Sequence, residues 1–138
     1  MSYVISGALQ TAIFDALIND ATLSTLIGSN IFDALPTGAL PETYVSLGRE
    51  RVQDASDKLV NGTLHQLEIS VITTQPGFSG AKDVATAISD RLHDADLTLS
   101  RGSLIFLRFE RAVARRIEGN SGREIVLRFR ARVEDAVQ

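Results

Sequence analysis

The side chains that could do chemistry in this chain are few, and they form no recognisable metal-binding motif. His65 and His93 are the only histidines; one is expected to begin a strand and the other to end a helix. A metal site needs at least three converging ligands, and no carboxylates stand at a ligand spacing from either histidine. We therefore expect surface or helix-end histidines, with His93 suited to the negative C-terminal end of a helix.

Three aspartates, Asp90, Asp94 and Asp96, suggest a cation site at first sight. Their spacing fits neither an EF-hand loop nor a two-metal centre, and acidic residues that flank a helix end are ordinarily solvated. We therefore predict no metal here.

Ser79 lies in the glycine-containing run Gly-Phe-Ser-Gly, which is most simply a turn and a helix cap. The run lacks the Gly-Lys-Ser/Thr ending of a phosphate loop, and residue 81 is Ala, so the nucleophile-elbow pattern fails as well. The chain also has no cysteine to act as a thiolate. We predict no catalytic and no cofactor-binding residue, and a small stand-alone enzyme would need His65, His93 and the aspartates to converge.

Arginine is concentrated at the C-terminal end of the chain. Residues 1–100 carry 12 acidic against 5 basic residues, a net charge of −7, whereas residues 101–138 carry 9 arginines against 5 acids, a net of +4. These arginines either line solvated strands or form an interface, since a guanidinium pairs bidentately with carboxylates and phosphates. The candidate interface residues are Arg108, Arg111, Arg115, Arg128, Arg130 and Arg132. Loose contact with DNA passing through a pore is compatible with this charge, whereas sequence-specific reading is not expected.

The chain length and the hydrophobic content favour one domain spanning residues 1–138. A chain of this length with 44% hydrophobic residues can build a single core. Neither an N-terminal signal pattern nor an apolar run of about 20 residues is present, so we expect no membrane association.

Hydrophobic periodicity and turn residues predict the elements of the first half. A helix is expected from Ser6 to Asn19, followed by a short helical turn from Thr22 to Leu26 that Thr22 caps and Gly28 ends. Strands are expected over Ile31–Leu35 and Tyr44–Val52, separated by a loop rich in proline and glycine.

The second half predicts a strand, a helix and a long β-hairpin. The strand covers Thr63–Thr73, and the helix of about 14 residues begins after Ser79 as its N-cap. The hairpin joins Leu104–Ile117 to Arg123–Glu134. If Ile117 pairs with Arg123, Glu110 faces Arg130, and the odd-numbered Arg111 and Arg115 interrupt the apolar face near a projecting tip.

This order of elements predicts an α+β fold. Helices that cover one face of a mostly antiparallel sheet give a two-layer sandwich, here with about four or five strands and two main helices, and with the long hairpin at the C-terminus.

The chain resembles the tail-completion, or tail-terminator, proteins of long-tailed phages, prophages and gene transfer agents. The resemblance covers nearly the whole sequence. Its motifs are GALQTAIFDAL, IFDALP, YVSLG, HQLEISVITTQPGFSGAKDVATAISDRLHDADLTL and RFERAVARRIEGNSGREIVLRFRARVE. These motifs are structural and designate no catalytic residue.

The resemblance implies an assembly part. Such a protein is expected to be made in the host bacterial cytoplasm and to form a ring, most simply a hexamer, at the neck-proximal end of the virion tail. There it would stop polymerisation of the tail tube protein and join the head-tail connector protein. A head-completion or neck protein of the same particle is the alternative.

Overall fold

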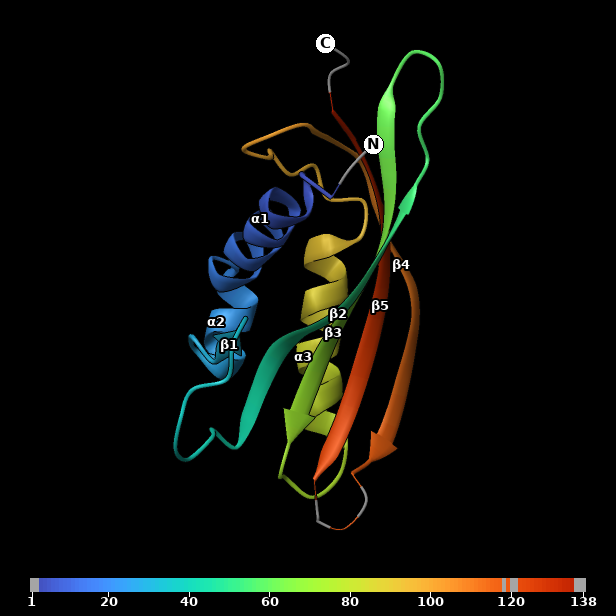
Figure 1. Cartoon of the computed structure of the whole chain (residues 1–138). Coiled ribbons are helices and arrows are strands. Elements are labelled where there is room, and N and C mark those ends of the chain that lie inside the picture. The colour runs from blue at the N-terminus through green and yellow to red at the C-terminus, as the bar shows by residue number, and fades with distance from the viewer. Residues whose placement is uncertain (1–2, 118, 120–121, 136–138) are drawn as a thin grey trace.

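The computed structural model describes residues 3–117, 119 and 122–135, in which two helices are followed by three strands, a third helix and two further strands. The elements are α1 (Ser6–Ile18), α2 (Ala21–Ile27), β1 (Ile31–Phe32), β2 (Thr43–Asp54), β3 (Asn61–Thr73), α3 (Ser79–Leu92), β4 (Ser103–Arg116) and β5 (Arg123–Asp135). Figure 1 shows the helices on one side of the sheet. The predicted α+β class is confirmed, with a five-stranded mixed sheet and three helices.

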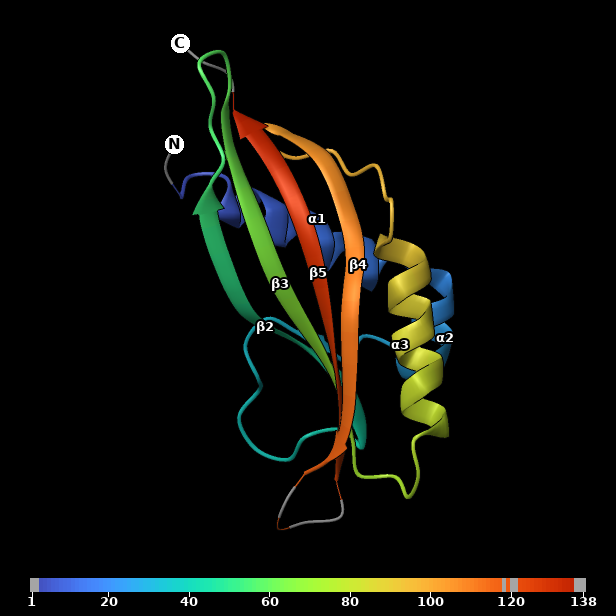
Figure 2. The same cartoon turned by 90° about the vertical axis from the view of Figure 1, so that its right-hand side faces the viewer.

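The last strand in sequence lies inside the sheet. The strand order is β1-β2-β3-β5-β4, so β5 is paired on both sides and β4 is an edge strand. β1 runs parallel to β2, and the other neighbours are antiparallel. We call the face covered by the helices the inner face and the opposite one, seen in Figure 2, the outer face.

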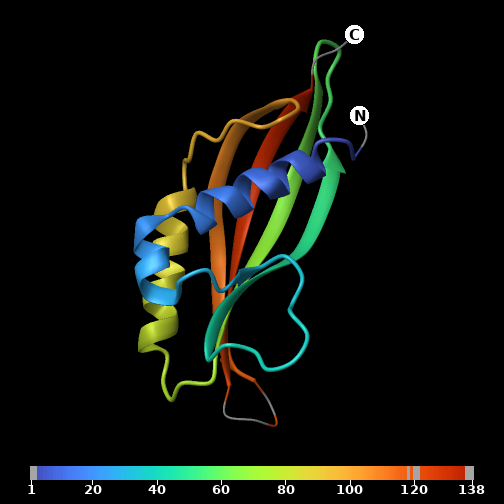
Figure 3. The same cartoon turned by 90° about the vertical axis from the view of Figure 1, so that its left-hand side faces the viewer.

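The core forms between the inner face and the apolar sides of α1 and α3. The odd-numbered residues of β5 from Ile125 to Val133 are buried, and so are the predicted apolar positions of α3. The α1 helix crosses the strands diagonally, and α3 lies beside β4 (Figure 3). Burial of these residues is the main source of stability.

Two predicted helix caps are wrong. Asp20, not Thr22, caps α2, because its carboxylate accepts a hydrogen bond from the Leu23 backbone N–H at 3.0 Å. The α3 helix already includes Ser79, so Phe78 occupies the N-cap position without a side-chain hydrogen bond. Gly28 ends α2 with a φ of 60°, as predicted.

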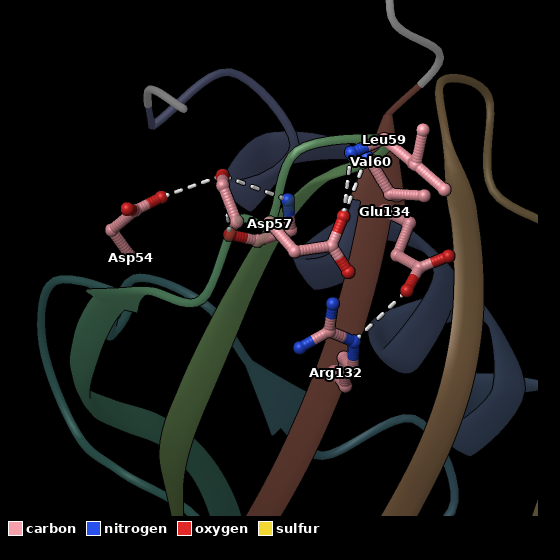
Figure 4. Close-up of polar contacts among 8 residues, drawn as sticks. Asp54, Asp57, Leu59, Val60, Arg132 and Glu134 are labelled. Atoms are coloured by element: carbon pink, nitrogen blue, oxygen red, sulfur yellow. Dashed lines mark hydrogen bonds and ion pairs between the residues drawn. The ribbon is translucent and has the colours of Figure 1, made fainter.

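The strands also differ in length from the prediction. β1 ends at Phe32 rather than at Leu35, and residues 33–40 are exposed and form no strand. β2 and β3 extend further, so the loop between them is only residues 55–60. The Asp57 carboxylate closes this loop by accepting from the backbone N–H groups of Leu59 (2.8 Å) and Val60 (2.9 Å), next to Arg132 and Glu134 (Figure 4).

The pairing of β4 with β5 corrects the predicted register. Arg116, rather than Ile117, pairs with Arg123, and Glu110 is the extra residue of a β-bulge between Phe109 and Arg111. Glu110 therefore does not face Arg130. A second irregularity lies between Leu104 and Phe106. The expected projecting tip falls on residues 118–122, of which 118, 120 and 121 lie outside the described residues.

Candidate assembly surface

All six predicted interface arginines lie on the outer face of the sheet. The even-numbered arginines of β5 alternate with its buried odd residues. On β4, Arg108 precedes the bulge and Arg111 and Arg115 follow it; because a bulge changes the parity of the strand, all three share a face. The predicted placement of Arg111 and Arg115 on the apolar face is therefore wrong.

Three of these arginines are neutralised within the chain. Arg128, about 25% exposed, lies 3.3 Å from Glu68 and 3.7 Å from Glu110. The Arg132 Nε donates to Glu134 Oε2 at 3.0 Å. Arg115 pairs with its cross-strand neighbour Glu124 at 2.8 Å. The cross-strand pairs Arg128–Glu68 and Arg115–Glu124 help set the register, and each of the three pairs stabilises the fold only modestly.

Three other arginines remain open to a partner. Arg108 and Arg130 are direct cross-strand neighbours, and their guanidinium carbons lie 4.4 Å and 5.4 Å from the centroid of the Phe106 ring. Arg108 approaches Asp94 only to 3.8 Å. Among the described residues, no carboxylate lies within 4 Å of Arg111 or Arg130. We call Arg108, Arg111 and Arg130 the open arginine patch.

The open arginine patch is suited to binding carboxylates or phosphates. Like charges directly opposite each other destabilise a strand pair, and an anion between them removes this repulsion. The Phe106 ring orients two of the planar donors by cation–π contact. The patch can therefore hold acidic side chains of another protein subunit or a nucleic-acid backbone.

A partly buried polar cluster, not expected from the sequence, joins β2, β3 and the start of α1. A bulge between Leu47 and Glu50 in β2 turns the Glu50 carboxylate toward His65 of β3. The His65 Nδ1–H donates to Glu50 Oε2 at 2.9 Å, and Nε2 lies 3.0 Å from Thr63 Oγ1. The hydroxyls of Tyr3 and Ser6 donate to Glu50 Oε1 at 2.7 Å and 2.6 Å.

These contacts set the protonation state of the cluster. Burial raises the pKa of Glu50, but hydrogen bonds from Ser6, Tyr3 and His65 outweigh it, so that the pKa lies below the usual value of 4.5. Glu50 is therefore an anion held between the start of α1 and two strands.

Thr63, His65 and Glu50 supply a hydroxyl, an imidazole and a carboxylate in the order of a nucleophilic triad. The cluster nevertheless has a structural role. Thr63 and His65 are buried, His65 to 1% exposure, so no substrate can reach the hydroxyl. The prediction of a surface histidine is wrong for His65. Its odd number, shared with the inward-facing Leu67 and Ile69, was the signal for burial.

His93 and the three aspartates lie at the end of α3. His93 is the C-cap residue, and its Nδ1 accepts a hydrogen bond from the Phe109 backbone N–H at 3.0 Å. Asp94 contacts His93 and Arg108. Within the described residues, no group of three or more acidic or histidine side chains could hold a metal ion. No described helix has both the length and the apolar character needed to cross a membrane.

Comparison with known proteins identifies the family. The model of the family "Tail completion protein gp17" matches residues 11–134. A solved chain from the virion of a native gene transfer agent (GTA) particle is similar, with 54% sequence identity and a TM-score of 0.92 over 96% of this chain and 99% of that chain. No curated protein sequence matches.

The family match and the similarity to a virion chain define the class, a structural virion protein rather than an enzyme. The chain belongs to the tail completion protein gp17 family, since the match covers most of its length. The resemblance and the non-enzymatic role predicted from the sequence are confirmed.

Proposed function

We propose that this protein closes as a ring on the neck-proximal end of a virion tail tube. The ring, most simply of six copies, stops tube polymerisation and provides the surface that the head-tail connector protein joins. Membership of the tail completion family and the similarity to a chain of a gene transfer agent virion support this role. The protein would be made in the host bacterial cytoplasm and act as part of the particle.

The open arginine patch is the observation that carries the proposal. Its three guanidiniums are exposed, lie on the paired strands β4 and β5, and form no hydrogen bond to a carboxylate in the described part of the chain. An assembly surface needs such unpartnered donors, because pairing them with a neighbour's acids gives specificity. Acids of a neighbouring subunit or of the tube protein are the partners we propose.

Charge separation within the chain favours cyclic assembly. Residues 1–48 contain Asp15, Asp20, Asp33 and Glu42 but no lysine or arginine, whereas β4 and β5 carry most of the arginines. Two different and complementary patches per subunit give a heterologous contact, which forms a ring when the rotation between neighbouring subunits closes. If arginines line the lumen, they can also contact the phosphates of passing DNA without sequence preference.

The decisive experiment compares particles made with and without this protein by negative-stain electron microscopy. Over-long tails in its absence are the expected result, because nothing would stop tube growth. Tails of normal length beside leaking heads would instead assign the protein to the head-completion or neck class and would overturn the terminator role.

Mass measurement tests the proposed ring. The free protein is expected to gain mass and form a closed oligomer when it is mixed with tube protein. A stable two-fold dimer that persists on tails would contradict the heterologous arrangement.

A further inference from the structure

An apolar groove lies between α3 and the inner side of the β4–β5 pair. It has a volume of about 330 Å³. Its walls are formed by Ala85 and Thr86 of α3 and by Phe109, Ala112, Ala114 and Ile125 of the strands. Ala112 and Ala114 leave space that larger side chains would fill, and Phe109 remains partly exposed. No described part of this chain covers the groove.

The edge of β4 beside this groove is also unpartnered. In the N-terminal half of β4, the same edge is covered by the end of α3. The Asp94 N–H donates to the Leu107 carbonyl, and the Phe109 N–H donates to His93 Nδ1. From Glu110 to Arg116, the side of β4 away from β5 has no backbone partner among the described residues. An open strand edge next to an apolar groove accepts an extended segment of another chain.

The chain contains a segment with the matching properties. Residues 33–40 are all exposed, and Leu35 and Leu40 are 50% and 42% exposed although leucine is usually buried. No backbone–backbone hydrogen bond is formed by residues 33–41 within the described structure. Pro36 and Pro41 favour an extended backbone around the two leucines.

The charges of the segment and of the groove are complementary. Asp33 and Glu42 flank the two leucines, and among the described residues the carboxylate of each accepts a hydrogen bond only from a neutral glutamine, Gln10 and Gln75 respectively. Lys82 lies on the α3 side of the groove, and Arg116 is the last residue of the open β4 edge. In the described residues none of these four charged groups forms an ion pair.

The geometry selects a second copy as the occupant. The loop after β1 extends from the β2 side of the sheet, and α3 with the groove lies at the opposite, β4 side; Figures 2 and 3 agree on this arrangement. Both features lie in the same half of the molecule, toward the β4–β5 turn. Subunits placed side by side would therefore bring the loop of one against the groove of the next.

We propose that residues 33–42 of one subunit bind in the groove between α3 and β4 of its neighbour, with Leu35 and Leu40 as anchors. The extended loop pairs with the free edge of β4, and Asp33 and Glu42 approach Lys82 and Arg116. This inference rests on the proposed ring and assigns the contact that joins its subunits.

Disulfide trapping tests the contact directly, because the natural chain has no cysteine. The variant L40C/A112C is assembled on tail tubes, oxidised and analysed on a non-reducing gel. We expect a ladder of covalent oligomers that a reductant collapses. The control L59C/A112C carries its first cysteine at an 82% exposed leucine in the loop before β3, and we expect it to form no ladder.

Charge exchange provides a second measurement that does not depend on oxidation. Lys82→Glu is expected to weaken self-association about tenfold, and adding Glu42→Lys should restore it. Assembly of both variants like the parent would overturn the assigned contact, as would equal ladders from the test pair and the control pair. A cross-link from Ala112→Cys to the tube protein instead would overturn the choice of a second copy.

The two proposals fail in different ways. Rings that cap tubes of normal length without a ladder from the test pair would overturn the groove contact and leave the terminator role intact. A ladder together with tails whose length does not depend on the protein would support the groove contact and remove the terminator role.

Discussion

Arg108 of β4 lies directly opposite Arg130 of β5, with the Phe106 ring within cation–π distance of both guanidiniums. Two like charges in this position cost stability in an isolated subunit. An acidic partner that supplies an anion between the two guanidiniums would remove this cost.

Reversing the charge of Arg130 should impair assembly more than it impairs folding. In Arg130→Glu, the repulsion with Arg108 becomes an attraction, so we expect the free energy of unfolding to change by less than about 1 kcal/mol. Assembly on tail tubes should weaken strongly, because the partner's acids would then meet a carboxylate. Urea unfolding and co-sedimentation with tubes measure the two effects.

Lys58→Glu is the matched control for this prediction, because Lys58 lies in the loop between β2 and β3 and is not part of the open arginine patch. It should assemble like the parent. Equal assembly of both variants would mean that Arg130 belongs to a solvated face.

The bulge at Glu110 predicts a contrast between two single-residue deletions. Deleting Glu110 removes the bulge but keeps Arg111 opposite Arg128 on the outer face, so only an ion pair is lost, at a cost of about 1 kcal/mol or less. Deleting Ala112 also restores a regular ladder, but it moves Arg111 opposite the buried Leu127. That change puts a charge on the apolar inner side of β4, where Ala112 now lies exposed, so it should cost more than the deletion of Glu110.

Urea unfolding of the two deletion variants measures the contrast. Equal destabilisation by both deletions would show that the bulge does not determine which face the arginines occupy.

Glu50 predicts a loss of stability in acid. Its pKa in the folded protein lies below 4.5, so the unfolded chain binds the proton more readily and stability falls as the pH drops below about 4.5. Glu50→Gln should lower the free energy of unfolding at neutral pH by about 1–3 kcal/mol, since charged hydrogen bonds are lost. The difference from the parent should shrink as the pH falls.

Urea titrations from about pH 7 to about pH 3 test this linkage. The exposed Asp96→Asn provides a control in which the difference from the parent should be small throughout. A Glu50→Gln difference that is independent of pH would contradict the assigned role of the carboxylate.

Asp57 predicts a local effect on backbone dynamics. Its pKa is lowered by hydrogen bonds from the Leu59 and Val60 amides, with Arg132 nearby. In Asp57→Ala, these two amides lose their acceptor and should exchange hydrogen faster, while the melting temperature stays close to that of the parent. Hydrogen exchange measured by NMR would reveal the change, and unaltered exchange at both amides would show that the carboxylate does not close the loop.

The sequence by itself determined the α+β class, the apolar stripes of α1 and α3, and the alternation of β5. These features depend on local periodicity, because a helix repeats its faces every 3.6 residues and a strand every two. The period-two spacing of Arg128, Arg130 and Arg132 is enough to put them on one face of a strand, and the family motifs correctly indicated tail completion.

Only the tertiary structure decided the features that depend on two bulges. The bulge at Glu110 brings Arg111 and Arg115 onto the face of Arg108, and the bulge before Glu50 turns that carboxylate to His65. A bulge changes the parity of every residue that follows it, and its position depends on how the paired strands fit against the core and each other. Pairing between strands far apart in sequence, such as β3 with β5, carries no local signal, so periodicity alone could not locate either cluster.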